Sequence, residues 1–209
     1  MALEPFPPVN YADEDGLLAV GGDLSPERLL LAYNSGIFPW FSEGQPILWW
    51  SPDPRFVLFP QELVVSQSMQ KVIRRNEFEI TMNTDFAQVI DQCARVKRKG
   101  QRGTWITKDM KRAYIQLQEL GNAVSVEARQ NGELVGGLYG VKVLGPNGAV
   151  FCGESMFSLV PNASKAAFIK LLQLQPFAII DCQVYTEHLE SLGARMISRD
   201  EYLQYLPLK

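Results

Sequence analysis

Residues 123–156 read AVSVEARQNGELVGGLYGVKVLGPNGAVFCGESM. Apolar and polar side chains alternate at the start of this stretch, and two clusters of turn-forming residues, 130–132 and 144–148, interrupt it. Asn and Gly favour the positive φ angles that a tight hairpin turn needs. The stretch therefore predicts three antiparallel strands that form the centre of the fold, over 123–128, 133–143 and 149–156.

Shorter patterns on both sides of this meander predict further strands and helices. Apolar residues recur at helical spacing over 108–120, and Gly121 is a typical helix end. Strands whose faces are covered by helices make an α+β domain, which is the fold class we predict. The other expected elements are strands over 56–58, 78–82 and 177–184 and helices over 66–75, 86–95 (capped by Thr84), 162–173 and 187–192, before a short tail.

The N-terminal segment predicts a helix followed by an aromatic cluster. Ser25 is a favourable N-cap, Pro26 suits the first helical position, and Gly36 lies just past the expected helix end. Three tryptophans and two phenylalanines follow between residues 36 and 54. Such side chains usually fill a small core, but they can also wall a ligand pocket. We expect most of them in the core and one or two in a site.

Composition limits the classes of protein that the chain can be. Its 209 residues are 46% hydrophobic, enough to bury a core without disulfides or metal. No apolar run approaches the ~20 residues that cross a bilayer, and no signal peptide is visible, so we expect a cytoplasmic protein without a membrane contact. Three dispersed cysteines argue against a disulfide framework, and a single histidine, His188, argues against zinc sites and Ser-His pairs.

Charge is segregated along the chain, although the net charge is only -3. Residues 65–112 carry eleven basic and five acidic side chains, whereas residues 1–64 carry two basic and nine acidic ones. A basic run of this kind can be a solvated face, or it can bind the phosphates of a nucleic acid. The charges alone leave these two interpretations equally open.

The chain contains neither a GxxxxGK[ST] phosphate loop nor a GxGxxG or HExxH motif. The order of the expected elements is similar to that of acyl-CoA N-acetyltransferases, whose cofactor loop is usually written [QR]xxGx[GA]. Residues 95–103 are basic and contain glycine but lack that spacing. An acetyl-CoA-dependent reaction is therefore an alternative and not the preferred interpretation.

Seven longer motifs occur in one order and spacing and together resemble the leucyl/phenylalanyl-tRNA-protein transferase family. The resemblance covers roughly residues 6–205, which is nearly the whole chain. The motifs are DGLLAVGGDLS (15–25), GIFPWF (36–41), LWWSPDPR (48–55), GTWI (103–106), GESMFS (153–158), NASK (162–165) and DCQV (181–184).

This resemblance implies an activity, a fold and a set of partners. Members of the family take Leu, Phe or Met from aminoacyl-tRNA and attach it to proteins with N-terminal Arg or Lys, which marks those proteins for degradation in the N-degron pathway. It also implies a small N-terminal domain, placed at 1–55, and an acetyltransferase-like catalytic domain at 56–209. It implies no metal and no coenzyme A or other cofactor, and we expect a monomer.

The same resemblance assigns residues to the site. It places Trp40 and Trp105 as aromatic walls near the 3'-terminal adenosine and Glu154, Asp181 and Gln183 at the reaction centre. Around the amino-acid side chain it places Leu138, Phe151, Gly153, Met156 and Ile180, with Leu138 standing where a methionine is expected. We expect Lys71, Arg74, Arg75, Arg95, Lys97, Arg98, Lys99 and Arg102 to follow the tRNA backbone.

Strand geometry gives an independent reason to single out two of these residues. Asp181 and Gln183 alternate along an otherwise apolar strand, so that both side chains are expected on one face and Cys182 on the other. They can simply meet solvent, or Asp181 can orient Gln183 while Gln183 orients the attacking amine by its carbonyl. Glu154 can likewise be a solvent-facing carboxylate, or it can fix the amino group of the aminoacyl ester. An N-acetyltransferase and a non-catalytic RNA-binding module remain the rival functions.

Overall fold

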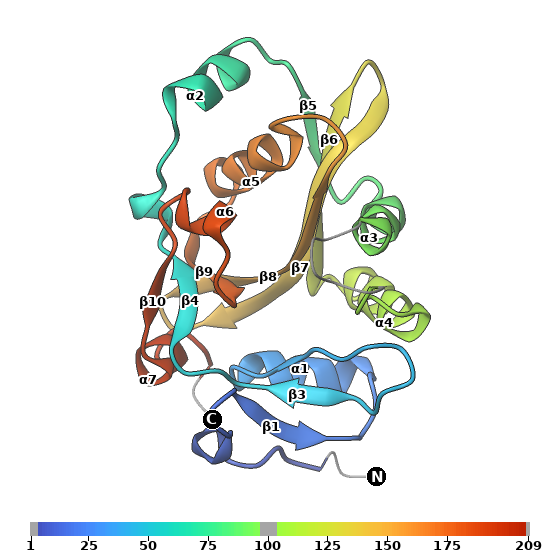
Figure 1. The fold of residues 1–209 in the computed structure, drawn as a ribbon, viewed down its shortest axis with the longest axis vertical. Coiled ribbons are helices and arrows are strands. Elements are labelled where there is room, and N and C mark those ends of the chain that lie inside the picture. The colour runs from blue at the N-terminus through green and yellow to red at the C-terminus, as the bar shows by residue number, and fades with distance from the viewer. Residues whose placement is uncertain (1–3, 97–103, 208–209) are drawn as a thin grey trace.

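The computed structural model describes residues 4–96 and 104–207 and has a seven-stranded sheet at its centre (Figure 1). The sheet has the order β10-β4-β9-β8-β7-β6-β5, and every neighbouring pair is antiparallel except β8 and β9. The predicted meander forms its middle and is confirmed. The strands are β4 (Arg55–Leu58), β5 (Glu79–Met82), β6 (Ala123–Gln130), β7 (Glu133–Gly145), β8 (Gly148–Ser158), β9 (Phe177–Gln183) and β10 (Arg195–Ile197).

Helices cover both faces of this sheet, which confirms the mixed α+β class. α3 (Phe86–Arg95) and α4 (Lys108–Glu119) pack on one face, and α5 (Ala163–Leu174) packs on the other (Figure 1). α2 (Gln67–Arg74) contacts α5 and lies at the end of the molecule far from both termini (Figure 1). Two short helices, α6 (Glu187–Glu190) and α7 (Arg199–Leu203), follow β9.

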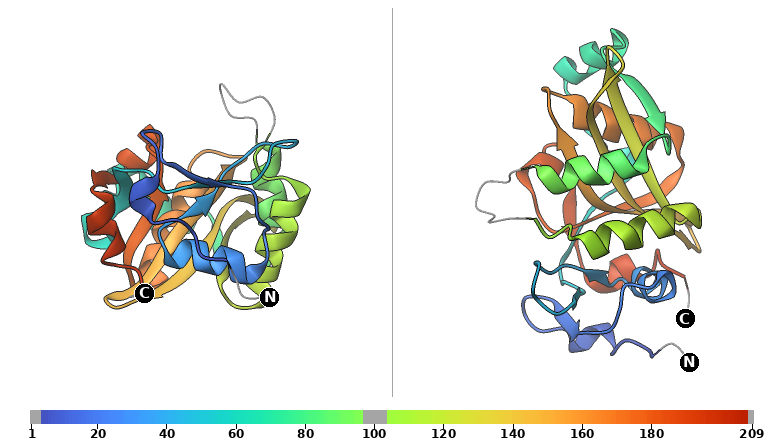
Figure 2. Two further views of the ribbon diagram at one scale, coloured as in Figure 1. Left: turned by 90° about the horizontal axis from the view of Figure 1, so that it is seen from below. Right: turned by 90° about the vertical axis from the view of Figure 1, so that its right-hand side faces the viewer.

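The N-terminal segment forms a small unit below the large sheet. Its three-stranded sheet has the order β1-β3-β2, with strands Leu17–Val20, Leu48–Trp50 and Phe38–Pro39, and α1 (Pro26–Asn34) packs beside it (Figure 2). The side chain of Ser25 accepts a hydrogen bond from the first turn of α1, as predicted. The predicted boundary between residues 55 and 56 stays a prediction, and β4 begins one residue before it.

One continuous apolar core joins this unit to the large sheet. Buried Leu29, Tyr33 and Trp49 from the N-terminal unit belong to the same cluster as Tyr114 of α4 and Val141 of β7. A second cluster lies on the opposite face, beneath α5. Because the first cluster spans both units, burial of apolar surface fixes their relative position.

Two details of the sequence prediction are wrong. Residues 195–203, expected to be a tail, add strand β10 to the sheet edge and form α7. Thr84 does not cap α3: Asp85 holds the cap position, and the Thr84 hydroxyl bonds to Glu127 instead. The sequence also gave no sign of the N-terminal sheet, whose strands are two to four residues long.

The reason for the misplaced cap is a buried carboxylate that collects neutral donors. Glu127 on β6 accepts hydrogen bonds from the hydroxyls of Thr81, Thr84 and Ser125 and has no exposed surface. Burial alone would raise the pKa of Glu127, but these hydrogen bonds outweigh burial and hold the pKa below its usual value. A carboxylate of this kind stabilises the fold above its unfolded-state pKa, and the contribution is lost as pH falls through the folded-state pKa.

We therefore predict that Glu127→Gln lowers the free energy of unfolding by about 1–3 kcal/mol at pH 7, because the amide leaves a donor without a partner. The loss should be smaller at pH 3–4, below the ordinary glutamate pKa of about 4.3, because the stabilisation from the charged carboxylate falls there. Urea denaturation at both pH values measures the difference. Glu133→Gln, at an exposed position of β7, is the control and should leave both values unchanged. An equal loss for Glu127→Gln at both pH values would contradict the charged-state assignment.

Candidate active site

The large sheet opens where β8 and β9 part. Their parallel ladder ends at the Cys152–Asp181 pair, although β8 continues to Ser158. A bulge in the β7–β8 ladder follows at Gly140, where a Cβ atom would lie 2.3 Å from the carbonyl oxygen of Cys152 and 2.5 Å from the Phe151 ring. Only glycine permits this close approach, at the point where the register of the β7–β8 ladder shifts.

The space between the parting strands is a cavity of about 520 Å³. Its walls come from β8, β9, the segment after β2, the start of α5 and the segment around α6, which includes His188. This cavity brings together the residues that the sequence assigned to the reaction centre, the aromatic walls and the side-chain pocket. They are Trp40, Trp105, Leu138, Phe151, Gly153, Glu154, Met156, Ile180, Asp181 and Gln183.

The predicted phosphate-binding residues do not line this cavity in the part of the chain that the structure describes. Lys71, Arg74 and Arg75 are exposed on α2, at the distant end of the molecule (Figure 1). Arg95 is exposed at the end of α3 and pairs with Asp91. The predictions for Lys97, Arg98, Lys99 and Arg102 fall outside the described residues.

The cavity has an apolar part and an aromatic rim. Leu138 and Met156 face each other across the β7–β8 ladder, and Phe151 and Ile180 pair across β8 and β9. Trp40 is 38% exposed and touches the ring of Trp50, whose indole N–H donates to the Trp40 carbonyl at 2.7 Å. A rigid, partly exposed tryptophan next to an apolar cavity can hold a flat ring by stacking.

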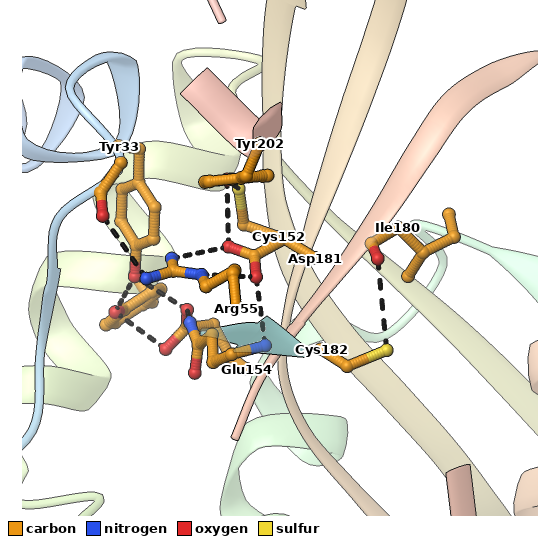
Figure 3. Close-up of polar contacts among 11 residues, drawn as sticks. Tyr33, Arg55, Cys152, Glu154, Ile180, Asp181, Cys182 and Tyr202 are labelled. Atoms are coloured by element: carbon orange, nitrogen blue, oxygen red, sulfur yellow. Dashed lines mark hydrogen bonds and ion pairs between the residues drawn. The ribbon is translucent and has the colours of Figure 1, made fainter. Parts of the chain in front are cut away.

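Glu154 lies at the polar end of the cavity and collects three neutral groups (Figure 3). The Tyr33 hydroxyl of α1 and the Gln183 side-chain amide donate to Oε1, each at 2.7 Å, and the Tyr114 hydroxyl of α4 donates to Oε2 at 2.9 Å. Burial raises the pKa of Glu154 to about 7, although the three hydrogen bonds act in the opposite direction. This carboxylate therefore exchanges a proton near neutral pH.

The hydroxyls of Tyr33 and Tyr114 also contact each other, so the cluster closes into a ring of three groups. Three mutual contacts need three protons, but the two tyrosines supply only two when Glu154 is ionised. A proton on Glu154 completes the set. In that state Glu154 donates to one tyrosine oxygen and reverses that bond, which is consistent with its raised pKa.

Asp181 has the opposite environment, because a cation faces it (Figure 3). Arg55 Nε donates to Asp181 Oδ1 at 2.8 Å and Arg55 Nη2 donates to Oδ2 at 2.7 Å, and both side chains are almost fully buried. Burial alone would lower the pKa of Arg55, but the Asp181 charge outweighs it and raises the pKa above its usual value. The Tyr202 hydroxyl of α7 also donates to Oδ2, at 2.9 Å.

The strand alternation that paired Asp181 with Gln183 stops at Gln183. Its φ is 64°, the left-handed region that non-glycine residues rarely adopt. The two residues are nevertheless joined, because the Gln183 backbone N–H donates to Asp181 Oδ1 at 2.9 Å. Strand alternation predicted that the two side chains lie together on one face. The hydrogen bond instead joins the Gln183 backbone to the Asp181 side chain.

Four further site residues were not predicted: Tyr33, Arg55, Tyr114 and Tyr202. Tyr33 and Tyr114 occupy apolar positions of helical patterns, so their sequence context indicates core and not site. Arg55 carried a usable signal, because it precedes the apolar run FVLF at the start of a strand. Tyr202 lies in the segment that was expected to be a tail.

The family model for leucyl/phenylalanyl-tRNA protein transferases matches residues 57–207, and the model for the N-terminal domain of the same proteins matches residues 22–53. The chain belongs to this family. The chain is 57% identical over 207 residues to the leucyl/phenylalanyl-tRNA–protein transferase of Flavobacterium johnsoniae, covering 98% of this chain and 96% of that one. The relative from Flavobacterium psychrophilum is 58% identical over 96% of this chain and 95% of its own. The predicted family, enzyme class and small N-terminal domain are confirmed.

Solved structures with a distant similarity to the chain include N-acetyltransferases. A ribosomal-protein-alanine N-acetyltransferase from Brucella melitensis has a TM-score of 0.38 and 16% identity, over 63% of this chain and 92% of that one. A GCN5-related N-acetyltransferase from Anabaena variabilis has a TM-score of 0.43 and 11% identity, over 80% of this chain and 41% of that one.

Over residues 4–96 and 104–207 no group of three or more His, Cys, Asp or Glu is placed to hold a metal ion. Within the same ranges no helix is long and apolar enough to span a membrane.

The Glu154 cluster predicts the effect of removing one donor. Tyr33→Phe should raise the pKa of Glu154, because the hydroxyl that favours the charged form is gone while burial remains. A carbon-13 NMR titration of the glutamate carboxyls measures this pKa directly. Tyr11→Phe, on an exposed ring, is the matched control and should leave the titration unchanged. A lower or unchanged pKa in Tyr33→Phe would contradict the cluster.

Proposed function

We propose that the chain moves Leu, Phe or Met from aminoacyl-tRNA to the N-terminal Arg or Lys of acceptor proteins, which marks them for N-degron degradation. We further propose that it works in the cytoplasm, as a monomer and without a cofactor. The observation that carries the proposal is a single cavity with an apolar pocket, an aromatic rim and a proton-exchanging carboxylate. Family membership supports an aminoacyl-tRNA donor and a protein acceptor.

In this reaction the α-amine of the acceptor attacks the ester carbonyl that joins the amino acid to the tRNA. A C–N bond forms and the C–O bond to the ribose breaks, while the amine loses a proton and the ribose hydroxyl gains one. An α-amine has a reference pKa of about 7.7–8.0, so part of it is neutral near pH 7. Modest basicity and accurate positioning are therefore sufficient.

Glu154 and Gln183 fit these two tasks. Glu154 Oε1 lies 2.7 Å from the Gln183 amide nitrogen, so the Gln183 carbonyl is free to accept from the incoming amine. We assign orientation of the amine to Gln183 and acceptance of its proton to Glu154 with Tyr33 and Tyr114. A carboxylate whose pKa is about 7 is well matched to an amine that titrates near 8.

The remaining assignments concern the donor. Leu138, Phe151 and Ile180 form an apolar pocket that suits a long unbranched or γ-branched side chain. Selection among donors should be graded, since each methylene is worth only about 1–3 kcal/mol in such a pocket. We assign Trp40 and Trp105 to stacking on the terminal adenosine, worth roughly 1–3 kcal/mol per base. The exposed basic residues of α2 would contact phosphates.

The deciding experiment follows labelled Leu or Phe from charged tRNA to a peptide that begins with Arg, without coenzyme A. Transfer supports the proposal and excludes both rival functions. A peptide that begins with Glu is the matched acceptor control. Transfer of acetyl groups from acetyl-CoA in place of the amino acid would favour an N-acetyltransferase, and tRNA binding without transfer would favour an RNA-binding module.

Leu138→Met should shift the kcat/KM ratio for Phe-tRNA over Leu-tRNA towards Phe. Methionine is unbranched and adapts more readily to a flat ring, and only packing changes, so the shift should be about 1 kcal/mol or less. Competition between the two charged tRNAs measures the ratio. Val124→Ile, a small apolar change in the same core cluster but outside the cavity lining, is the control. An unchanged ratio with intact activity would remove Leu138 from the pocket.

The α2 residues give a prediction on salt dependence. Replacing Lys71, Arg74 and Arg75 by glutamine should weaken the binding of every tRNA alike and flatten the plot of log affinity against log salt. Each lost phosphate contact removes about 0.9 from the slope on duplex. Filter binding over a salt series measures it. Lys142→Gln on β7 is the control. An unchanged slope in the triple variant would show that these basic residues form a solvated face and do not contact tRNA phosphates.

A further inference from the structure

Arg55 is an unusual cation for its position. Among the lysines and arginines of the described residues it is the only buried one, with 1% of its surface exposed. An arginine at the start of a strand normally reaches solvent, and a buried charge is costly unless it is paired. The position therefore requires a reason beyond packing.

The guanidinium of Arg55 connects three parts of the chain. Besides its two bonds to Asp181 on β9, Nη1 donates to the carbonyl of Gly36 at 3.2 Å. Gly36 has a φ of 74°, and a Cβ atom there would lie 2.8 Å from Leu203 of α7, so glycine is required. The rings of Phe38 and Tyr202 lie 4.8 Å from the guanidinium carbon. Together these hydrogen bonds and ring contacts fix the position and orientation of the Arg55 guanidinium.

Asp181 has no acceptor site to spare for a substrate. Oδ1 accepts from Arg55 Nε and from the Gln183 backbone, and Oδ2 accepts from Arg55 Nη2 and from the Tyr202 hydroxyl. A carboxylate offers about four lone-pair sites, and these four donors use them. Its charge is also compensated by the guanidinium. We therefore expect Asp181 to influence the reaction through Gln183, whose backbone it binds.

Asp181 holds the strained residue that carries the site amide. The left-handed backbone of Gln183, at φ 64°, is strained for a residue with a side chain, and such strain persists only where contacts enforce it. The bond from the Gln183 N–H to Asp181 is such a contact. In this conformation the Gln183 amide reaches Glu154 at 2.7 Å.

We propose that Arg55 is a positioning residue for aminoacyl transfer: it fixes Asp181, which holds Gln183 in the left-handed conformation that sets its amide against Glu154. The inference deepens the proposed function and rests on it. Tyr202 supports the same carboxylate from α7, so residues 55, 181 and 202 act together on one backbone conformation.

Arg55→Lys tests the arrangement with the charge retained. A lysine cannot make the two-pronged bond to Asp181, so the carboxylate loses its fixed orientation. We expect kcat for transfer to fall at least tenfold while KM for aminoacyl-tRNA changes less than threefold, because the apolar pocket and aromatic rim are untouched. Arg195→Lys is the matched control: Arg195 also makes a two-pronged bond, to the exposed Glu62.

A double-mutant cycle with Gln183→Leu separates positioning from general stability. If Arg55 acts through Gln183, Arg55→Lys should have little further effect on kcat in the Gln183→Leu protein. A structural role predicts the same fold-loss in both backgrounds, and that result would overturn the proposal. Tyr202→Phe removes one donor to Asp181 without changing the charge. It should lower kcat by a smaller factor, and that loss should also depend on the presence of Gln183. This variant replaces Arg55→Lys in the cycle if Arg55→Lys does not fold.

A titration of Glu154 by carbon-13 NMR provides a readout that needs no activity. Groups from three elements face this carboxylate: Tyr33 on α1, Tyr114 on α4, and Gln183 with Asp181 on β9. Loss of the Gln183 donor should raise the pKa of Glu154, and Arg55→Lys should raise it in the same direction only when Gln183 is present. An unmoved titration would contradict the link. If the parent protein transfers no amino acid, the proposed function fails while the titration still decides the Arg55 link.

Discussion

The buried ion pair between Arg55 and Asp181 is the interaction on which the rest of the site depends. It joins β4, the first strand of the large sheet in the chain, to its neighbour β9. Arg55 also bonds to Gly36 just after α1, and Asp181 also bonds to Tyr202 of α7. Buried pairs contribute little net stability, because the desolvation of both charges offsets their attraction, yet losing one partner typically costs about 3–5 kcal/mol. Such a pair is therefore better explained by the geometry that it enforces.

The two buried carboxylates of the site, Glu154 on β8 and Asp181 on the neighbouring β9, have contrasting environments. We use this contrast to separate their proposed roles. Asp181 is paired with the Arg55 guanidinium. Glu154 accepts hydrogen bonds from neutral donors only, and burial, with a smaller contribution from the Asp181 charge, raises its pKa to about 7. Neighbouring acidic groups whose environments differ in this way can divide positioning and proton transfer between them. This contrast supports the proposed division of roles, with positioning at Asp181 and proton transfer at Glu154.

The sequence predicted the meander, most helices and the residues around the cavity, because these depend on local periodicity and on motifs that lie in a recognisable order. It missed what depends on distant pairing. β10 pairs with β4, which lies about 140 residues earlier in the chain. Thr84 does not cap α3, because its hydroxyl bonds to the Glu127 carboxylate on β6. Arg55 and Asp181 are 126 residues apart, and no local pattern links them. Long-range pairing of polar groups was therefore the part that required the structure.

The geometry also explains how ester aminolysis can proceed on a fold built from ordinary side chains. The leaving ribose hydroxyl is a far poorer acid than the attacking ammonium, so the proton must leave nitrogen before or as the C–O bond breaks. A carboxylate of low pKa would stay charged near pH 7, where it is a weak base and attracts the protonated, unreactive amine. A carboxylate of pKa about 7, bonded to two tyrosines, binds the amine less rigidly and can return the proton to the ribose oxygen. In the proposed mechanism the cluster alternates between its two protonation states in each turnover, so that Glu154 both accepts the amine proton and supplies the proton for the ribose oxygen.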